Sequence, residues 1–569
     1  MPTHQTSDWI EATVHRLAHR ELYGNQHEAF GNFQVWTDDI IEHLGVAARL
    51  EGHAGCVNTL RWSHSGNLLA SGSDDRKAKI WGCDGQLLHT ISTGHDHNIF
   101  GAEFIPNHND QLIATSSGDH TARLHNLEYK DELCVWRAEG RVKRLATAND
   151  EAHLFWSASE DGAIRQYDVR TNDETKIVAE HDSYKSLAIC PGRTELLALA
   201  CIEEFVPIYD RRNTAKQLMS VQPGDYNHGD MQRRYPTHVG FDELGKELLV
   251  NMGGGSVYVF DIASPEESRP MVWDQLDNIL AEDCGPQPQI KPTGAVAEKR
   301  ALAKRFLEEK AYLPAYDAYS AAFMECPEEL VDDRSIMLAN RAMVMLARQE
   351  DGDYYECVRD CVRALGLAKG NAKALYRLTR ALILLRRLEL AKACVELFKK
   401  RFPDDKSYVQ LEKKIDDVKN NRERIWSTSR DYKERYTAHR NNHTDIKEAA
   451  FIGGKEGWIA AGSDCGNMYI WERKTGRLRA AFKADEDILN IVQPHPILPL
   501  IATSGIEKDI RFWGPLPEGK ESAERHADPY DAVIPAARSA HYDMLERNPV
   551  LLHSLQEGIQ SGRVQCANQ

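Results

Sequence analysis

A Gly-His pair at residues 52–53 is followed by VNTLRW (57–62), LLASGSDD (68–75) and AKIW (78–81). Apolar residues recur along these runs, and turn residues such as SHSG (63–66) separate them. Apolar and polar residues in alternation predict half-buried β-strands, and Ser, Gly and Asp between the runs predict tight turns. Short antiparallel strands joined by tight turns are typical of one blade of a β-propeller.

The same pattern recurs along the chain with fixed positions for a turn aspartate and an aromatic residue. In the first copy these residues are Asp75 and Trp81, which lie six positions apart, and His53 stands at the start of the blade. In propeller blades such residues hydrogen-bond with a Ser or Thr, so we expect them to be structural and not catalytic. Matching positions in later copies are occupied by Asp119, Asp161, Trp471 and Trp513.

The number of copies decides the topology. Five copies lie within residues 47–285, and two more lie within residues 425–516. Seven blades close into a ring and leave no open sheet edge. We therefore predict one seven-bladed propeller that is interrupted after its fifth blade, with residues 47–50 as the outer strand of the last blade. Weak signals in the fourth and fifth copies leave six or eight blades as alternatives.

Residues 286–424 change from a period of two to a period of 3.6, which predicts helices. If Pro327 is position 32 of a tetratricopeptide repeat, small residues fall where the paired helices must approach closely, at Ala303, Ala315 and Ala322. The same count from Pro403 places Thr379 and Ala391 at equivalent positions. We predict an all-α insert of three repeats with a capping helix, which is long enough to be stable.

Such arrays have a concave groove that binds peptides. In chaperone-type members, basic and amide side chains in this groove grip a C-terminal carboxylate. The equivalent positions here are Arg300, Lys304, Asn340, Lys373 and Arg377. Lys304 departs from that pattern, because asparagine is expected there. Two interpretations stay open, a solvated basic helix face and a groove for an acidic peptide tail.

Blades three and four end in one short pattern, Tyr167-Asp168-Val169-Arg170 and Tyr209-Asp210-Arg211-Arg212. Each copy places an arginine three residues past the aromatic residue, on the same rim of the propeller. Two adjacent copies resemble the aromatic-Asp-x-Arg signature of substrate receptors for cullin-4 RING ubiquitin ligases. The resemblance implies that Arg170 and Arg212 face the propeller adaptor of the ligase. Ordinary capping of the strand ends is the alternative.

Residues 1–46 predict a helix-loop-helix that precedes the propeller. Ile10, Val14 and Leu17 fall at helical spacing, and TDDIIEHLG (37–45) predicts a second short helix. These helices either pack on their own domain or, as in receptors of the ligase type, enter the cleft of the adaptor. In the second case Arg16 and Arg20 are exposed along the first helix.

The composition favours a protein-binding function inside the cell. A net charge of −16 argues against general nucleic-acid binding, and no apolar run is long enough to cross a membrane. The 12 cysteines form no CxxC pair, which speaks against a metal site and for a reducing compartment, the nucleus and cytoplasm. Because no nucleophile elbow, P-loop or HExxH motif is present, we expect no enzyme and no cofactor.

The order of the parts resembles the WD and tetratricopeptide repeat protein family of the adipose type. The stretches that carry the resemblance are EGHAGCVNTLRW (51–62), FWSASEDGAIRQYDVR (155–170), ELLVNMGG (247–254) and LIATSGI (500–506). The likeness covers nearly all of residues 8–515, whereas the tail at 517–569 has little that aligns. Cys465 also departs from the pattern, because the turn aspartate of the sixth blade belongs there.

The resemblance implies a seven-bladed WD40 propeller that works as a non-enzymatic scaffold. It further implies a substrate receptor of a cullin-4 RING E3 ubiquitin ligase, acting in the control of fat storage and transcription. The expected partners are the ligase adaptor and client proteins. The alternative is a ligase-independent co-regulator or chaperone-linked scaffold that binds acidic peptide tails, chromatin, or histone and deacetylase complexes.

Overall fold

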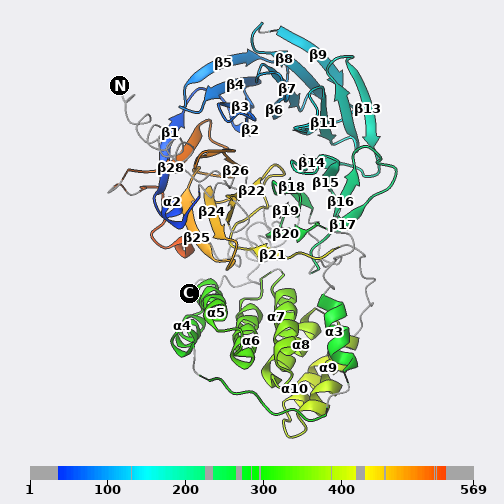
Figure 1. Ribbon diagram of the computed structural model, residues 1–569, viewed down its shortest axis with the longest axis vertical. Helices are drawn as coiled ribbons and strands as arrows, with labels where there is room; N and C mark the ends of the chain where they lie inside the picture. Colours follow the sequence, from blue (N-terminus) through cyan, green and yellow to red (C-terminus); the bar gives the residue numbers. More distant parts are fainter. Residues whose placement is uncertain are drawn as a thin grey trace, which may run out of the picture.

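The computed structural model describes residues 36–533, apart from 130, 225–234, 264–271, 283–284, 294–295, 351, 386, 418–429, 454–456, 518–519 and 521. A ring of β-sheets and a separate helical array lie against each other (Figure 1). The predicted first helix, with Arg16 and Arg20, lies outside the described residues. The predicted second helix is present as α2 (Asp38–Glu42), and the Thr37 hydroxyl caps it by accepting from the Ile40 amide at 3.3 Å.

Within the described residues, the strands form seven antiparallel sheets of four strands, which confirms the predicted propeller. The first two blades contain β2 (Val57–Trp62), β3 (Leu68–Ser73), β4 (Lys77–Gly82) and β5 (Leu87–Ser92), then β6 (Ile99–Phe104), β7 (Leu112–Ser117), β8 (Thr121–Asn126) and β9 (Asp131–Arg137). The third and fourth contain β10 (Val142–Thr147), β11 (Leu154–Ser159), β12 (Ile164–Asp168) and β13 (Asp173–Val178), then β14 (Tyr184–Ile189), β15 (Leu196–Cys201), β16 (Val206–Asp210) and β17 (Met219–Val221).

The last three blades include strands from distant parts of the chain. The fifth contains β18 (Pro236–Phe241), β19 (Glu247–Met252), β20 (Val257–Asp261) and β21 (Glu434–Tyr436), and the sixth contains β22 (Ala449–Ile452), β23 (Trp458–Gly462), β24 (Asn467–Glu472) and β25 (Leu478–Lys483). The seventh contains β26 (Leu489–Pro494), β27 (Ile501–Gly505), β28 (Ile510–Pro515) and β1 (Leu44–Leu50). The N-terminal strand therefore closes the ring, as predicted from residues 47–50, and Leu50 pairs with Ile510.

The helical insert lies inside the fifth blade, so the prediction of an interruption after a complete fifth blade is wrong. β21 follows the helices in sequence and pairs with β20, with Val257 opposite Tyr436 and Val259 opposite Glu434. A three-residue outer strand is too short to carry a readable alternation of apolar and polar residues. The sequence pattern consequently marks only the three inner strands of this blade.

The side-chain network predicted for the first blade is present. The His53 ring lies 2.9 Å from Asp75 Oδ2 and 2.8 Å from Ser71 Oγ, and the Trp81 indole donates to Ser71 Oγ at 2.9 Å. The second blade repeats it, because His95 lies 2.9 Å from both Asp119 and Thr115. Burying such a network is favourable because each polar group finds a partner.

Other blades keep only parts of this network. Asp161 pairs with Arg165 at 2.5 Å, so an arginine takes the place of the histidine. Trp513 donates to Thr503 Oγ1 at 2.8 Å as in the first blade, but Trp471 donates to the Thr437 carbonyl at 2.9 Å.

A buried carboxylate near the propeller axis joins several blades. Glu448, which directly precedes β22, is fully buried and accepts hydrogen bonds from Arg144 of β10 and Gln493 of β26. Arg61 of β2 lies 3.4 Å from the same carboxylate. Burial alone would raise the pKa of Glu448, but the two arginines outweigh burial and lower this pKa to about 2.

The helical array contains three helix pairs and a final helix, in agreement with the predicted repeats. The helices are α4 (Ala297–Glu308), α5 (Tyr312–Glu325), α6 (Val331–Arg348), α7 (Asp353–Leu367), α8 (Ala372–Leu384), α9 (Leu388–Arg401) and α10 (Tyr408–Asp417). The small residues expected at the helix crossings are fully buried, namely Ala303, Ala315, Ala322, Thr379 and Ala391. Small side chains at these positions let the helix axes approach closely.

One helix was missed in the sequence analysis. α3 (Val272–Ala281) precedes the array in sequence but packs beside α7 and α9 at its far end (Figure 1). An extended segment then runs back to α4, and the Thr293 amide donates to the Asp333 carboxylate at 3.1 Å. Val272, Trp273, Leu276 and Ile279 are buried, and their helical spacing is the signal in the sequence from which α3 could have been predicted.

Polar contacts fix the array to the fifth blade. Tyr355 of α7 donates to Asp431 at 2.6 Å, and Tyr432 donates to Glu356 of α7 at 2.7 Å. The Arg359 guanidinium lies 4.0 Å from the centre of the Tyr432 ring. The donors and acceptors come from both the helical array and the propeller. Each of these two parts therefore supplies hydrogen-bond partners for buried groups of the other.

Replacing Ser71 tests the network of the first blade. We expect Ser71→Ala to lower the free energy of unfolding by about 1–3 kcal/mol, since the buried Trp81 indole and His53 ring lose a shared partner. Urea unfolding measures this change. The control is Ser92→Ala, at an exposed position of β5, and an equal loss in both variants would contradict the structural role of Ser71.

Replacing Glu448 tests the contact at the axis. Because its folded-state pKa of about 2 lies below its ordinary value of 4.5, its stabilisation is complete above about pH 5 and disappears as the pH falls toward 2. We expect Glu448→Gln to cost about 3–5 kcal/mol at pH 7, because the buried Arg144 loses its counter-charge while Arg61 keeps Glu103, and to flatten the acid side of the stability profile. Thermal melting between pH 3 and pH 7 measures both effects, with the exposed Glu486→Gln as control. A profile that keeps its wild-type slope in Glu448→Gln would contradict the assignment.

Candidate functional site

The candidate adaptor surface is built at the ends of β12 and β16. Both are the third strands of neighbouring four-stranded sheets, so their C-terminal ends emerge on the same rim. Tyr167 and Tyr209 are buried there, and their hydroxyls lie 2.9 Å from Ser157 Oγ and 2.7 Å from Glu180 Oε2. The two tyrosines therefore anchor the strand ends inside the blades, and the residues that follow them lie at the surface.

Each anchor is followed by an aspartate that holds an arginine. Arg170 donates through Nε and Nη2 to Asp168 at 3.1 and 2.7 Å, and its amide donates to the same carboxylate at 2.9 Å. Arg212 repeats this arrangement with Asp210, at 2.9 and 2.7 Å from the side chain and 3.0 Å from the amide. The hydrogen bond from Arg170 lowers the pKa of Asp168 to about 2, and the bond from Arg212 lowers the pKa of Asp210.

The two arginines are exposed despite these bonds. Their side chains are 60% and 67% accessible to solvent. A guanidinium has five N–H donors, and two of them point at the local aspartate in each case. The remaining donors are held in a fixed direction at the surface. We call the exposed pair Arg170 and Arg212, with their aspartates, the rim clamp.

Arg211 has a different role, which the sequence analysis did not find. Its side chain is nearly buried, lies 5.1 Å from the Trp156 ring and pairs with Asp150 and Glu151 at 3.3 Å. These partners belong to the third blade, whereas Arg211 belongs to the fourth. The residue therefore fixes the two blades that carry the rim clamp relative to each other.

The candidate peptide groove draws its residues from three parallel helices. Arg377 of α8 donates to the Ala339 carbonyl at 2.5 Å and to Asn340 Oδ1 of α6 at 3.3 Å. Its second nitrogen lies 3.2 Å from the sulfur of Met343, a residue 43% exposed. The structure therefore brings Asn340 and Arg377 together beside an exposed apolar side chain.

The other three groove residues are less closely joined. Lys304 lies 3.4 Å from Glu308 on its own helix, and both side chains are exposed. Lys373 is exposed in the first turn of α8, and Arg300 is half-buried on α4. Burial raises the pKa of Tyr319, an effect that the charges of Arg377 and Arg300 oppose, so these two arginines lie on the same side of the array.

Side chains of the types that bind metal ions are scattered over the described residues. Among them, no group of three or more His, Cys, Asp or Glu side chains is placed to hold a metal ion. Cys357 and Cys361 are fully buried on α7, and burial raises the pKa of the Cys357 thiol well above its ordinary value. In the described part of the chain, no helix is both long enough and apolar enough to span a membrane.

Comparison with known proteins identifies sequences that are similar to this chain. The WD domain, G-beta repeat, matches residues 45–82 and 85–126. The WD and tetratricopeptide repeats protein 1 of Homo sapiens is 31% identical, over 90% of this chain and 90% of that protein, and the Mus musculus protein gives the same values. The DDB1- and CUL4-associated factor 6 of Homo sapiens is 32% identical over 39% of this chain and 29% of its own length.

The match to the Homo sapiens WD and tetratricopeptide repeats protein 1 covers 90% of this chain, so it includes both the propeller and the helical insert. The chain belongs to the family of WD and tetratricopeptide repeat proteins.

Proposed function

We propose that this protein is a non-enzymatic substrate receptor of a cullin-4 RING ubiquitin ligase. The observation that carries the proposal is the rim clamp, two exposed arginines held in one geometry on adjacent blades. Arginines are frequent among the residues that dominate protein interfaces, because a pre-oriented guanidinium loses little entropy on binding. The name of one relative, DDB1- and CUL4-associated factor 6, supports the same partner.

In this proposal the propeller and the helical array bind different partners. The rim clamp binds the propeller adaptor of the ligase, with Arg16 and Arg20 of the N-terminal segment as further contacts. The helical array selects client proteins. On the family resemblance, the proposal extends to the control of fat storage and transcription, in the nucleus and cytoplasm.

A second function is favoured by the groove. Asn340 and Arg377 meet beside Met343, so a basic and amide donor pair adjoins an apolar side chain. Such a surface suits an acidic peptide tail with an apolar residue near its end. If the rim clamp is dispensable, the protein acts instead as a co-regulator or chaperone-linked scaffold that recruits chromatin, histone or deacetylase partners through this groove.

Removing the rim clamp tests the receptor function. We expect Arg170→Ala/Arg212→Ala to weaken binding of the purified cullin-4 adaptor at least ~30-fold, since two pre-oriented arginines are lost from one interface. Biolayer interferometry with the full chain measures the affinity. Thermal melting should remain unchanged, because both side chains lie at the surface.

The control is Arg141→Ala, in the same blade as Arg170. Arg141 directly precedes β10, on the opposite rim, and its side chain is also 60% exposed. Equal adaptor affinity in the double variant and the wild type, or loss in Arg141→Ala alone, would rule out the rim clamp as the docking surface.

Replacing Lys373 tests the groove separately. We expect Lys373→Ala to weaken binding of a labelled acidic peptide with a free C-terminal carboxylate about 5–10-fold, because an exposed cation near that carboxylate is removed. Fluorescence anisotropy measures this, and the same peptide with an amidated C-terminus should bind wild type as weakly as the acid peptide binds the variant. Lys414→Ala, an exposed change on α10, is the control. If Lys373→Ala binds as the wild type does, this face is simply solvated.

A further inference from the structure

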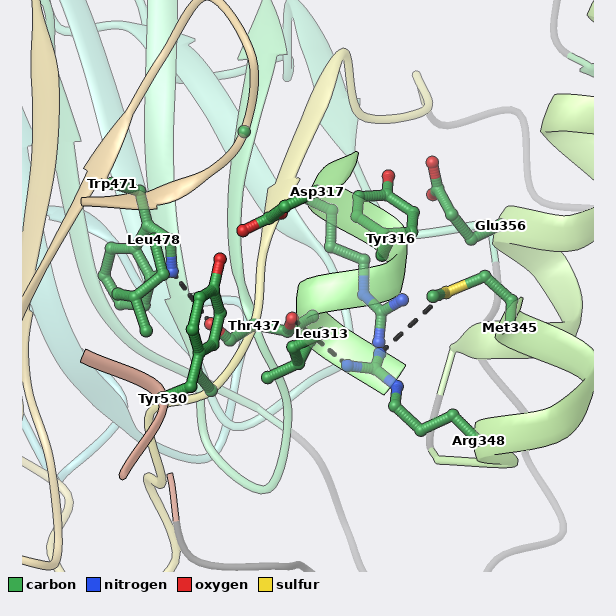
Figure 2. A pocket seen from close by; sticks show the side chains of 13 residues that line it. Leu313, Tyr316, Asp317, Met345, Arg348, Glu356, Thr437, Trp471, Leu478 and Tyr530 are labelled. Atoms are coloured by element: carbon green, nitrogen blue, oxygen red, sulfur yellow. Dashed lines mark hydrogen bonds between the residues drawn. The ribbon is translucent and has the colours of Figure 1, made fainter. Parts of the chain in front are cut away.

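A pocket lies at the junction of the helical array and the propeller (Figure 2). The pocket opens to solvent, and the space between its walls, counted together with the open solvent at its mouth, is about 440 Å³. Its walls come from α5, α6 and α7 of the array, from β21 and the β24–β25 hairpin of the propeller, and from the 3-10 helix η1 (Pro529–Ala532). The apolar and aromatic part of the lining includes Leu313, Tyr316, Trp471, Leu478 and Tyr530, and the charged part consists of Asp317, Arg348, Glu356 and Arg435.

Among the residues that the structure describes, two polar atoms of this lining have no hydrogen-bond partner. They are Asp317 Oδ2 and Tyr530 Oη, and both are buried. Figure 2 shows the Asp317 carboxylate and the Tyr530 hydroxyl directed toward the space beside Trp471. Burying a carboxylate without a partner is costly, and burial raises the pKa of Asp317 well above its ordinary value.

The cationic side chains near Asp317 lie against other carboxylates or are exposed to solvent. Arg341 pairs with Asp360 at 2.5 Å, and Arg348 pairs with Asp353 at 2.5 Å. Arg435, which also lines the pocket, lies 3.4 Å from Asp353, and Arg477 is exposed in the hairpin between β24 and β25. The carboxylate oxygen inside the pocket therefore faces aromatic rings and a hydroxyl in place of a bound cation.

We propose that this pocket binds a primary ammonium group on a slender alkyl chain. The ammonium donates to Asp317 Oδ2 and Tyr530 Oη, and the rings of Trp471 and Tyr316 surround it. Aromatic faces attract cations, and the attraction is stronger where water is excluded. The alkyl stem contacts Leu313 and Leu478.

The lining favours an amine over other ligands. An anion would meet an unpaired carboxylate, and the guanidinium groups of Arg341 and Arg348 are committed to other carboxylates. A hard metal ion prefers several oxygen ligands, and the described residues hold no cluster of that kind. A neutral apolar ligand would leave both buried oxygen atoms without a partner.

The site is independent of the rim clamp, so it can be tested without the ligase. The probe is n-butylammonium, which matches a lysine side chain beyond its α-carbon, and 1-pentanol is its neutral counterpart of similar size. We expect n-butylammonium to raise the Tm of the full chain and to bind by calorimetry, whereas pentanol has no effect. Asp317→Asn should weaken n-butylammonium binding at least ~10-fold, and Tyr530→Phe about 3–10-fold.

Stability of the free variants provides a second readout. Because Asp317→Asn removes a buried charge without a partner, the free variant should melt at a higher temperature than the wild type. Asp404→Asn, an exposed change after α9, should alter neither stability nor binding. If Asp317→Asn does not fold, Tyr530→Phe alone carries the binding test.

The source of the ammonium is distinguished by a second ligand, a capped Ala-Lys-Ala peptide. Binding of the peptide at least as tight as that of n-butylammonium assigns the pocket to a lysine side chain of a partner protein. Binding of n-butylammonium alone assigns it to free amines. Failure of both to bind the wild type, or equal binding to the wild type and to the folded variants, overturns the proposal.

Discussion

The pairing of β20 with β21 is the constraint on which the rest of the architecture depends. β20 ends at Asp261, the helical array follows, and β21 returns at Glu434 to complete the same sheet. Both ends of the insert are therefore held in one blade, and the array has little freedom to move away from the propeller. A flexible linker between complete domains would leave their relative position open. Here backbone hydrogen bonds of the fifth blade hold both ends of the insert, and the contacts of Tyr355 and Tyr432 hold the array against that blade.

This fixed junction explains why charged groups are buried between the two bodies. Asp353 of α7 accepts from Arg348 at 2.5 Å and lies 3.4 Å from Arg435, which sits in β21. Such a buried group is tolerable only if its partners stay in place, since a lone buried charge costs several kcal/mol. Asp317 lies at the same junction, and one of its oxygens has no hydrogen-bond partner among the described residues. A rigid junction that supplies partners to the Asp353 carboxylate but leaves an oxygen of Asp317 without one has the character of a preformed binding site.

Much of the fold was predictable because its determinants are local. The alternation within β2 to β4 and the small residues Ala303 and Ala315 depend on neighbours that are close in sequence. The misses depended on distant partners. β21 is too short for a pattern, and although the apolar spacing of α3 is local, its position on α7 depends on helices that are distant in sequence. Arg211 looked like part of the repeated rim pattern, but its buried contacts with Trp156 depend on how two blades meet.

The candidate site follows the same division. The rim clamp was predictable because Asp168 and Arg170 are two residues apart, so the contact follows from the local chain. The groove was only partly predictable, since Arg377 reaches Asn340 on another helix while Lys304 turns to Glu308. A surface set by local sequence tolerates changes elsewhere in the fold. The junction pocket, by contrast, needs six separate segments at once, namely α5, α6, α7, β21, the β24–β25 hairpin and η1, so any ligand held there reports on whether the array and the propeller are correctly assembled.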